Sequence, residues 1–156
     1  MKYMYLFIFL VFSMPSFSYE SLPSNCSNLD EVVEESFVIF SKMEFIQLGE
    51  CLAENLLKKR KTLNIVDACN EVVEDKNNYL GILSLSKAES IKIGQCAGAI
   101  KYIYTRYDEE LVPHRPGYYS SHRVYRCKKG STAIEAIRKS GEVSMNRENL
   151  RDLLCD

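Results

Sequence analysis

The cysteines carry the clearest chemistry in this 156-residue sequence, because a thiol can be oxidised to a disulfide or can bind a metal ion. There are six of them: Cys26, Cys51, Cys69, Cys96, Cys127 and Cys155. An even number of cysteines in an exported chain predicts a disulfide framework. The spacing alone does not choose among the pairings that six cysteines allow.

Catalytic and metal-binding patterns are missing from the sequence. There is no Cys-x-x-Cys pair, and only His114 and His122 could join a cysteine in binding a metal ion. A Cys–His catalytic pair needs a reduced thiol, and six exported cysteines argue against one. No Gly-x-Ser-x-Gly elbow or phosphate-binding loop is present. We therefore expect no catalytic residue, no metal and no cofactor, and we interpret the chain as a binding protein rather than an enzyme.

The second stretch of interest runs from Asp108 to His122, where Pro113, Pro116 and Gly117 break the helical pattern. Its side chains are of the kinds that dominate binding interfaces, Tyr and Arg above all. The candidate partner-binding residues are His114, Arg115, Tyr118, Tyr119, His122 and Arg123. Long loops on rigid scaffolds tend to carry function, so we expect a partner to bind here. A plain solvated connection is the alternative.

The N-terminus predicts a secretory signal peptide, residues 1–18. Lys2 precedes an apolar run from Tyr3 to Phe12, which is too short to span a membrane. Pro15 and the sequence Ser16-Phe17-Ser18 supply a break and a small-x-small cleavage pattern. We expect a periplasmic or secreted protein whose mature part, residues 19–156, is a single helical domain.

The charge of the chain excludes two classes of partner. Loss of Lys2 with the signal peptide brings the net charge from −1 to near −2. A chain of this charge has no electrostatic attraction for nucleic acid or for an anionic membrane. We expect no nucleic-acid partner, and no membrane association after signal cleavage.

The elements that position these residues are predicted to be helices. Apolar residues recur with a helical period, and no segment alternates with the period of two that marks a strand. The pattern predicts an all-α bundle of about six helices, cross-linked by disulfides. The expected helices run from Ser27 or Asn28 to about Phe40, from Ser41 into the basic run Lys58–Lys61, from Thr62 or Asn64 to about Asp75, from Ser86 to about Tyr107, from Gly130 to Ser140, and from Ser144 or Asn146 to Cys155.

The longest of these helices has a marked start and two glycines in its interior. Ser86 and Glu89 have the spacing of a capping box. Gly94 and Gly98 each cost about 1 kcal/mol against alanine in a helix, so they predict a close approach by another element. The stretch 41–51 repeats 86–96 at Ser, Lys, Glu, Ile, Gly and Cys. A true duplication and a coincidence of helix signals both remain open.

The sequence around Cys96 resembles the Rap/Tai family of type VI secretion system amidase immunity proteins. Those small exported helical proteins have a helix of the Cys-x-Gly-Tyr-Ile type, a later Cys, a Gly-x-Thr helix start and a final amphipathic helix ending in Cys. The matching residues here are Gln95–Ile103, Cys127–Thr132 and Leu150–Cys155, with Cys69 as the upstream cysteine. The resemblance covers about residues 62–155.

The resemblance implies a periplasmic protein, often dimeric, that docks on a peptidoglycan amidase delivered by neighbouring cells and occludes its cleft. By the resemblance and by chain order we expect Cys96 to pair with Cys127. Of the pairings that stay open to the other four cysteines, we favour Cys69 with Cys155 and Cys26 with Cys51. Two other functions remain as alternatives: a periplasmic disulfide-bonded chaperone or envelope-stress factor, and a secreted effector.

Overall fold

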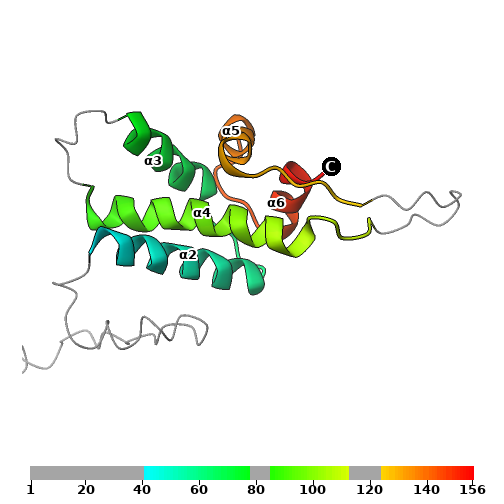
Figure 1. The fold of residues 1–156 in the computed structure, drawn as a ribbon, viewed down its shortest axis with the longest axis horizontal. Coiled ribbons are helices and arrows are strands. Elements are labelled where there is room, and N and C mark those ends of the chain that lie inside the picture. The colour runs from blue at the N-terminus through cyan, green and yellow to red at the C-terminus, as the bar shows by residue number, and fades with distance from the viewer. Residues whose placement is uncertain (1–40, 78–84, 113–123) are drawn as a thin grey trace, which may run out of the picture.

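Figure 1 shows the computed structural model, which describes residues 41–77, 85–112 and 124–156. These ranges contain five helices: α2 (Lys42–Lys58), α3 (Ile65–Asn77), α4 (Lys87–Tyr107), α5 (Gly130–Lys139) and α6 (Arg147–Leu154). Extended pairing within the same ranges is limited to isolated bridges. The all-α prediction is therefore confirmed, with five helices against about six expected. The helix expected before Ser41 and the predicted signal peptide lie outside the described residues.

The two predicted capping boxes are present and set where α2 and α4 begin. At α4 the backbone N–H of Glu89 donates to Ser86 Oγ at 3.2 Å, and the N–H of Ser86 donates to Glu89 Oε2 at 2.6 Å. Ser41 and Glu44 make the same pair of bonds at the start of α2. The bond from the Ser41 backbone N–H holds the pKa of Glu44 below its usual value. Both helices thus begin at the residue that the sequence predicts.

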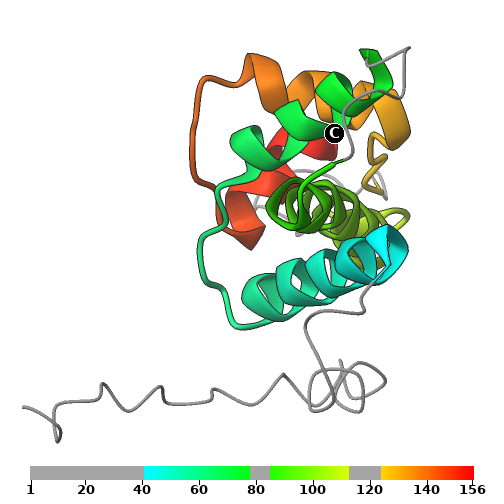
Figure 2. The same cartoon turned by 90° about the vertical axis from the view of Figure 1, so that its left-hand side faces the viewer.

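Helix α4 is the centre of the fold and contacts all four of the other described helices. Figures 1 and 2 show α2 on one side of α4 and α3, α5 and α6 on the other. The main core includes Ala53 and Leu57 of α2 but lies mostly on this second side, where α4 contributes Cys96, Ala99 and Ile103, each fully buried. The core side chains that meet them include Ile65, Ile137, Leu150 and Leu154. One helix therefore organises two separate layers.

The contact between α2 and α4 is made by backbone against backbone. A Cβ atom added at Gly94 would lie within 3 Å of the Ile46 carbonyl carbon and the Gly49 Cα. A Cβ at Gly98 would stand 2.6 Å from both the Cα and the carbonyl oxygen of Glu50. Real Cβ atoms do not approach backbone atoms so closely. The prediction that Gly94 and Gly98 admit a close neighbour is confirmed, and α2 is that neighbour.

The disulfides differ from the expected pairing. Cys69 of α3 is bonded to Cys96 of α4, and Cys127 is bonded to Cys155, so the predicted Cys96–Cys127 and Cys69–Cys155 pairs are wrong. Cys127 lies beside Asp108, just past the end of α4. Cys96 lies about 16 Å from that end of α4, because a helix rises 1.5 Å per residue. A disulfide allows only about 7 Å between Cα atoms, so Cys96 and Cys127 are too far apart to be bonded.

The remaining predicted pair is only half described. Cys51 is disulfide-bonded, and its predicted partner Cys26 lies outside the described residues. The two described disulfides are typical of a protein that folds in an oxidising compartment. No helix in the described ranges has the length and apolar character needed to cross a bilayer.

Gly94→Ala tests the contact between α2 and α4. Alanine favours an isolated helix, but here its methyl group would enter the backbone of α2. We expect the free energy of unfolding to fall by about 1–3 kcal/mol or more, measured by urea denaturation. The control is Gln47→Ala, an exposed change on α2, which should be nearly neutral. Equal stability of the Gly94→Ala protein and the wild type would mean that the helices do not meet at this glycine.

Candidate functional site

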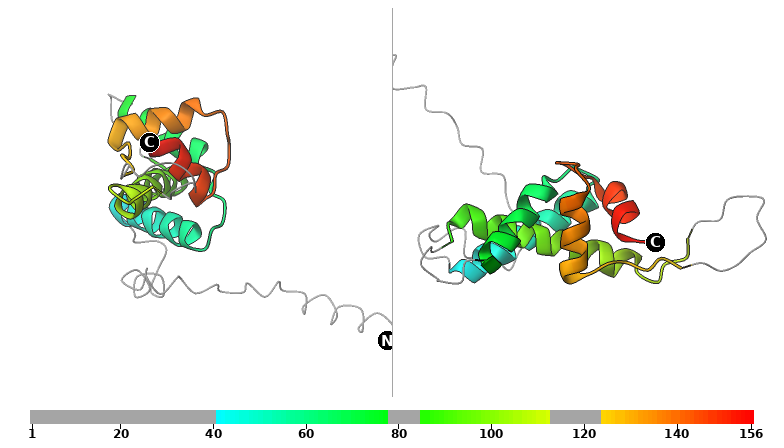
Figure 3. Two further views of the ribbon diagram at one scale, coloured as in Figure 1. Left: turned by 90° about the vertical axis from the view of Figure 1, so that its right-hand side faces the viewer. Right: turned by 90° about the horizontal axis from the view of Figure 1, so that it is seen from above.

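The six candidate partner-binding residues, His114, Arg115, Tyr118, Tyr119, His122 and Arg123, all lie outside the described residues. The structure describes the two chain segments that lead into and out of this stretch, residues 108–112 and 124–128. Together with residues 154–156 they form the feature that we call the stem. Figures 1 and 3 show the first two segments running side by side, away from the helices.

The stem is held by backbone hydrogen bonds between its three segments. The N–H of Glu109 donates to the Tyr125 carbonyl oxygen at 3.0 Å, and the N–H of Tyr125 donates to Glu110 at 2.9 Å. Arg126 and Asp156 exchange a reciprocal pair at 2.9 and 3.1 Å. Residues 124–128 are therefore the middle segment, paired with the end of α4 on one side and with the chain after α6 on the other.

The Cys127–Cys155 disulfide cross-links the middle segment to the last one. The same two residues also form an isolated antiparallel bridge. The backbone N–H of Cys127 donates to Asp108 Oδ1 at 2.9 Å, so Cys127 is tied to both neighbouring segments. This bond holds the pKa of the Asp108 carboxyl below its usual value of 3.8, assisted by Tyr104 and the positive charges of Arg126 and Lys129.

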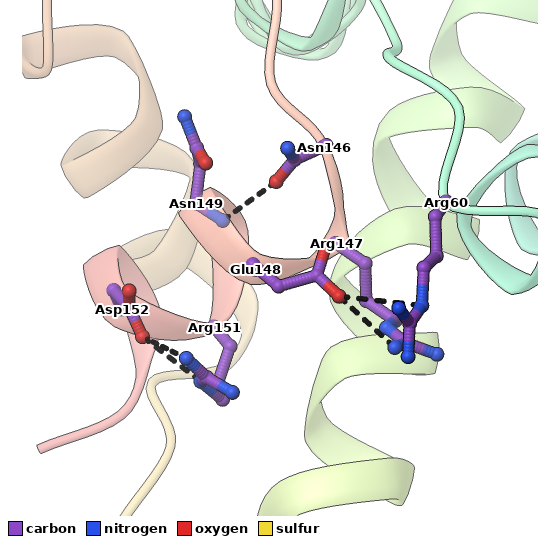
Figure 4. A network of polar contacts seen from close by, with 7 residues as sticks. All are labelled: Arg60, Asn146, Arg147, Glu148, Asn149, Arg151 and Asp152. Atoms are coloured by element: carbon purple, nitrogen blue, oxygen red, sulfur yellow. Dashed lines mark hydrogen bonds and ion pairs between the residues drawn. The ribbon is translucent and has the colours of Figure 1, made fainter.

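Arg151 of α6 joins the stem to the bundle. Its guanidinium lies over the ring of Tyr107, at 5.7 Å from the centroid, and over the ring of Tyr125, at 5.9 Å. Asp152 accepts two hydrogen bonds from the same guanidinium, at 2.9 and 2.7 Å, as Figure 4 shows. Cation–π contacts of this kind are worth about 0.5–1 kcal/mol at exposed sites. The stack orients Tyr125, a stem residue, against the last turn of α4.

A second polar network links α6 to the chain after α2. Glu148 faces two cations, with its carboxylate 3.0 Å from Arg147 and 3.7 Å from Arg60 (Figure 4). The carboxyl has a lowered pKa because hydrogen bonds and these two cations outweigh its partial desolvation. The side chain of Arg60 is 72% exposed, so its share in stability is small. This network positions α6 and offers no free reactive group.

One concave surface of the described residues lies beside the central helix. A groove of about 260 Å³ lies between α2 and α4, and its charges are largely paired, Lys101 with Glu50 at 3.7 Å and Arg106 with Glu110 at 3.4 Å. In the described ranges no three His, Cys, Asp or Glu side chains are grouped so that they could hold a metal ion. The stem is thus the described feature closest to the predicted binding residues.

No protein-family model, no curated protein and no solved structure matches this chain. Its function must therefore be inferred from its own residues and their geometry.

The sequence reasoning missed two contributors to the stem, Asp108 and Arg151. Asp108 has no local signal, because the amide that it accepts from belongs to Cys127, 19 residues later. Arg151 has none, because its partners Tyr107 and Tyr125 lie far from it in the sequence. The predicted bond from Cys127 to Cys96 is wrong, and Cys127 is instead bonded to Cys155, another residue of the stem.

Acid should loosen the stem through Asp108. Its pKa is lowered by folding, so its contribution to stability is complete above about pH 4 and is lost as the pH falls through the folded-state value, which lies below 3.8. The amide shift of Cys127, followed by NMR, should report a midpoint below 3.8 that disappears in Asp108→Asn. A midpoint at or above 3.8 would contradict the hydrogen bond.

Removal of the Cys127–Cys155 disulfide should affect the stem more than the bundle. In the double variant Cys127→Ala/Cys155→Ala, hydrogen exchange should accelerate at the amides of Arg126, Lys128 and Asp156 while α2 and α4 stay protected. The matched variant Cys69→Ala/Cys96→Ala removes a fully buried disulfide and should lower global stability by about 3–4 kcal/mol. Unchanged exchange at the stem amides in the first variant would show that its backbone pairing is sufficient alone.

Proposed function

We propose that this protein is an exported, immunity-type binding protein that docks on a peptidoglycan amidase effector of a type VI secretion system and blocks its cleft. The observation that carries the proposal is the stem. A rigid helical bundle holds both ends of a stretch rich in Tyr and Arg, with hydrogen bonds, the Cys127–Cys155 disulfide and the Arg151 stack. The resemblance over residues 62–155 and the two disulfides support the family and the compartment.

Inhibition by docking needs no chemistry from this chain. Pro113 and Pro116 restrict the backbone of the stretch between the two stem segments, which lowers the entropy lost when it is ordered in a cleft. Fixing the two ends of the stretch lowers that cost further. Tyr118, Tyr119 and Arg115 would supply the apolar area and the directed hydrogen bonds that dominate interface energies.

The partner can be identified directly. The mature protein, immobilised through a surface lysine, should capture a cell-wall amidase from the secreted fraction of the producing organism, identified by mass spectrometry. The captured enzyme should lose activity on purified peptidoglycan when one equivalent of the protein is added. Capture of an amidase whose activity is unchanged would contradict inhibition by occlusion.

Loop substitutions separate binding from folding. Tyr118→Ala, Tyr119→Ala and Arg115→Ala should each weaken binding of the captured partner by about 1 kcal/mol or more, measured by calorimetry, with the Tm nearly unchanged. Arg106→Ala, an exposed change on α4, is the matched control for Arg115→Ala and should bind like the wild type. Wild-type affinity of the triple loop variant would exclude this stretch as the binding element.

A further inference from the structure

Helix α2 has a small apolar face that is not part of the main core. Leu48, only 7% exposed, forms a small cluster with the partly buried Cys51, Leu52 and Ile91, separate from the main core. Among the described helices α2 has an extensive contact with α4 alone. The residues that cover this cluster therefore have to be sought beyond the described helices.

Cys51 gives the first indication of what covers it. Its sulfur is part of a disulfide. The other four described cysteines form the pairs Cys69–Cys96 and Cys127–Cys155. Cys26 is the one cysteine of the sequence that remains. The chain before Ser41 thus contains the residue with the chemistry to reach this face.

The contact between α2 and α4 gives the second indication, because it has the symmetry of an internal repeat. Gly49 packs against the carbonyl oxygen of Ile91, and Gly94 packs against the carbonyl oxygen of Ile46. Ile46 and Ile91 are 45 positions apart in the sequence, and so are Gly49 and Gly94. The same shift of 45 relates Ser41 to Ser86 and Cys51 to Cys96. Both helices run in the same direction in Figure 1. The two copies therefore match in space as well as in sequence.

The second copy shows what precedes such a helix. Helix α3 lies against α4, joined to it by the disulfide from Cys69 to Cys96. Lys92 of α4 reinforces the contact with ion pairs to Asp67 at 2.9 Å and Glu71 at 3.0 Å, which raise its pKa. An acidic helix, bonded through a cysteine near its start, thus covers the face of α4 that carries Cys96.

The sequence before Ser41 contains two features of α3, a cysteine and an acidic tetrapeptide, although Cys26 lies five residues before its tetrapeptide and Cys69 only two before its own. Cys26 precedes Ser41 by 15 residues, and Cys69 precedes Ser86 by 17. The tetrapeptide Glu-Val-Val-Glu occurs at 31–34 and again at 71–74 in α3. In that second occurrence Val72 packs against the main core.

We propose that residues 26–40 dock on the apolar face of α2 as α3 docks on α4, held by a Cys26–Cys51 disulfide. Oxidation of the two thiols releases two protons and passes two electrons to a disulfide oxidant, such as oxidised glutathione during refolding. The proposal is independent of the proposed amidase partner.

The first experiment maps the disulfide in the oxidised mature protein. Proteolysis without reductant, followed by mass spectrometry, should yield a peptide that links Cys26 to Cys51 within one chain. A chain that migrates as a covalent dimer through Cys51 would overturn the proposal and assign the face to a second copy. A free thiol at Cys26 would overturn it as well.

The second experiment tests docking with a matched pair of substitutions. On a helix, Val33 lies within about 20° of Cys26, two turns later, whereas Val38 lies about 120° away from it. Val33→Asp should lower the Tm by roughly 5 °C or more and accelerate hydrogen exchange in α2, while Val38→Asp should leave both nearly unchanged. Equal effects of the two substitutions, or no effect of either, would overturn docking through this face.

Discussion

The contact of α2 with α4 through their backbones is the constraint on which the rest of the fold depends. Three glycines, Gly49, Gly94 and Gly98, remove the side chains that would hold two helices at the usual distance of about 8–10 Å. The gain is close packing along the length of α2, and it offsets the helix propensity that the glycines cost. Because α2 occupies one side of α4 so tightly, Ile100 and Ile103 of α4 belong to the main core, while Ile91 packs with Leu48 of α2.

The two described disulfides fasten different parts of this arrangement. Cys69–Cys96 lies wholly inside the core and fixes α3 on α4, where Lys92 already pairs with two carboxylates. Cys127–Cys155 lies at the other end of the molecule, where the last residues of α6 meet the stem. The first disulfide stabilises the helical bundle. The second cross-links two segments of the stem, which lies next to residues 113–123.

Much of the fold could be predicted because its signals are local. Ser86 with Glu89 predicts a helix start from four residues, and Gly94 with Gly98 predicts a close neighbour without naming it. The disulfide pairing could not be predicted, because helical periodicity gives the face on which Cys96 lies but not its distance from Cys127 along the helix axis. The stack of Arg151 on Tyr107 and Tyr125 depends on three distant segments meeting, and no local pattern encodes such a meeting. The all-α class was thus within reach of the sequence, whereas the construction of the stem was not.

Neither described disulfide links the part of the chain before residues 113–123 to the part after them. Both partners of Cys69–Cys96 precede residues 113–123, and both partners of Cys127–Cys155 follow them. A protease that cut once within 113–123 would therefore leave two pieces that neither described disulfide joins. The pieces would stay together through the packing of Ile137, Leu150 and Leu154 on α4 and through the stem hydrogen bonds of Tyr125. Residues 113–123, the stretch proposed to contact a partner, are also the place where one cut would leave pieces that the described disulfides do not join.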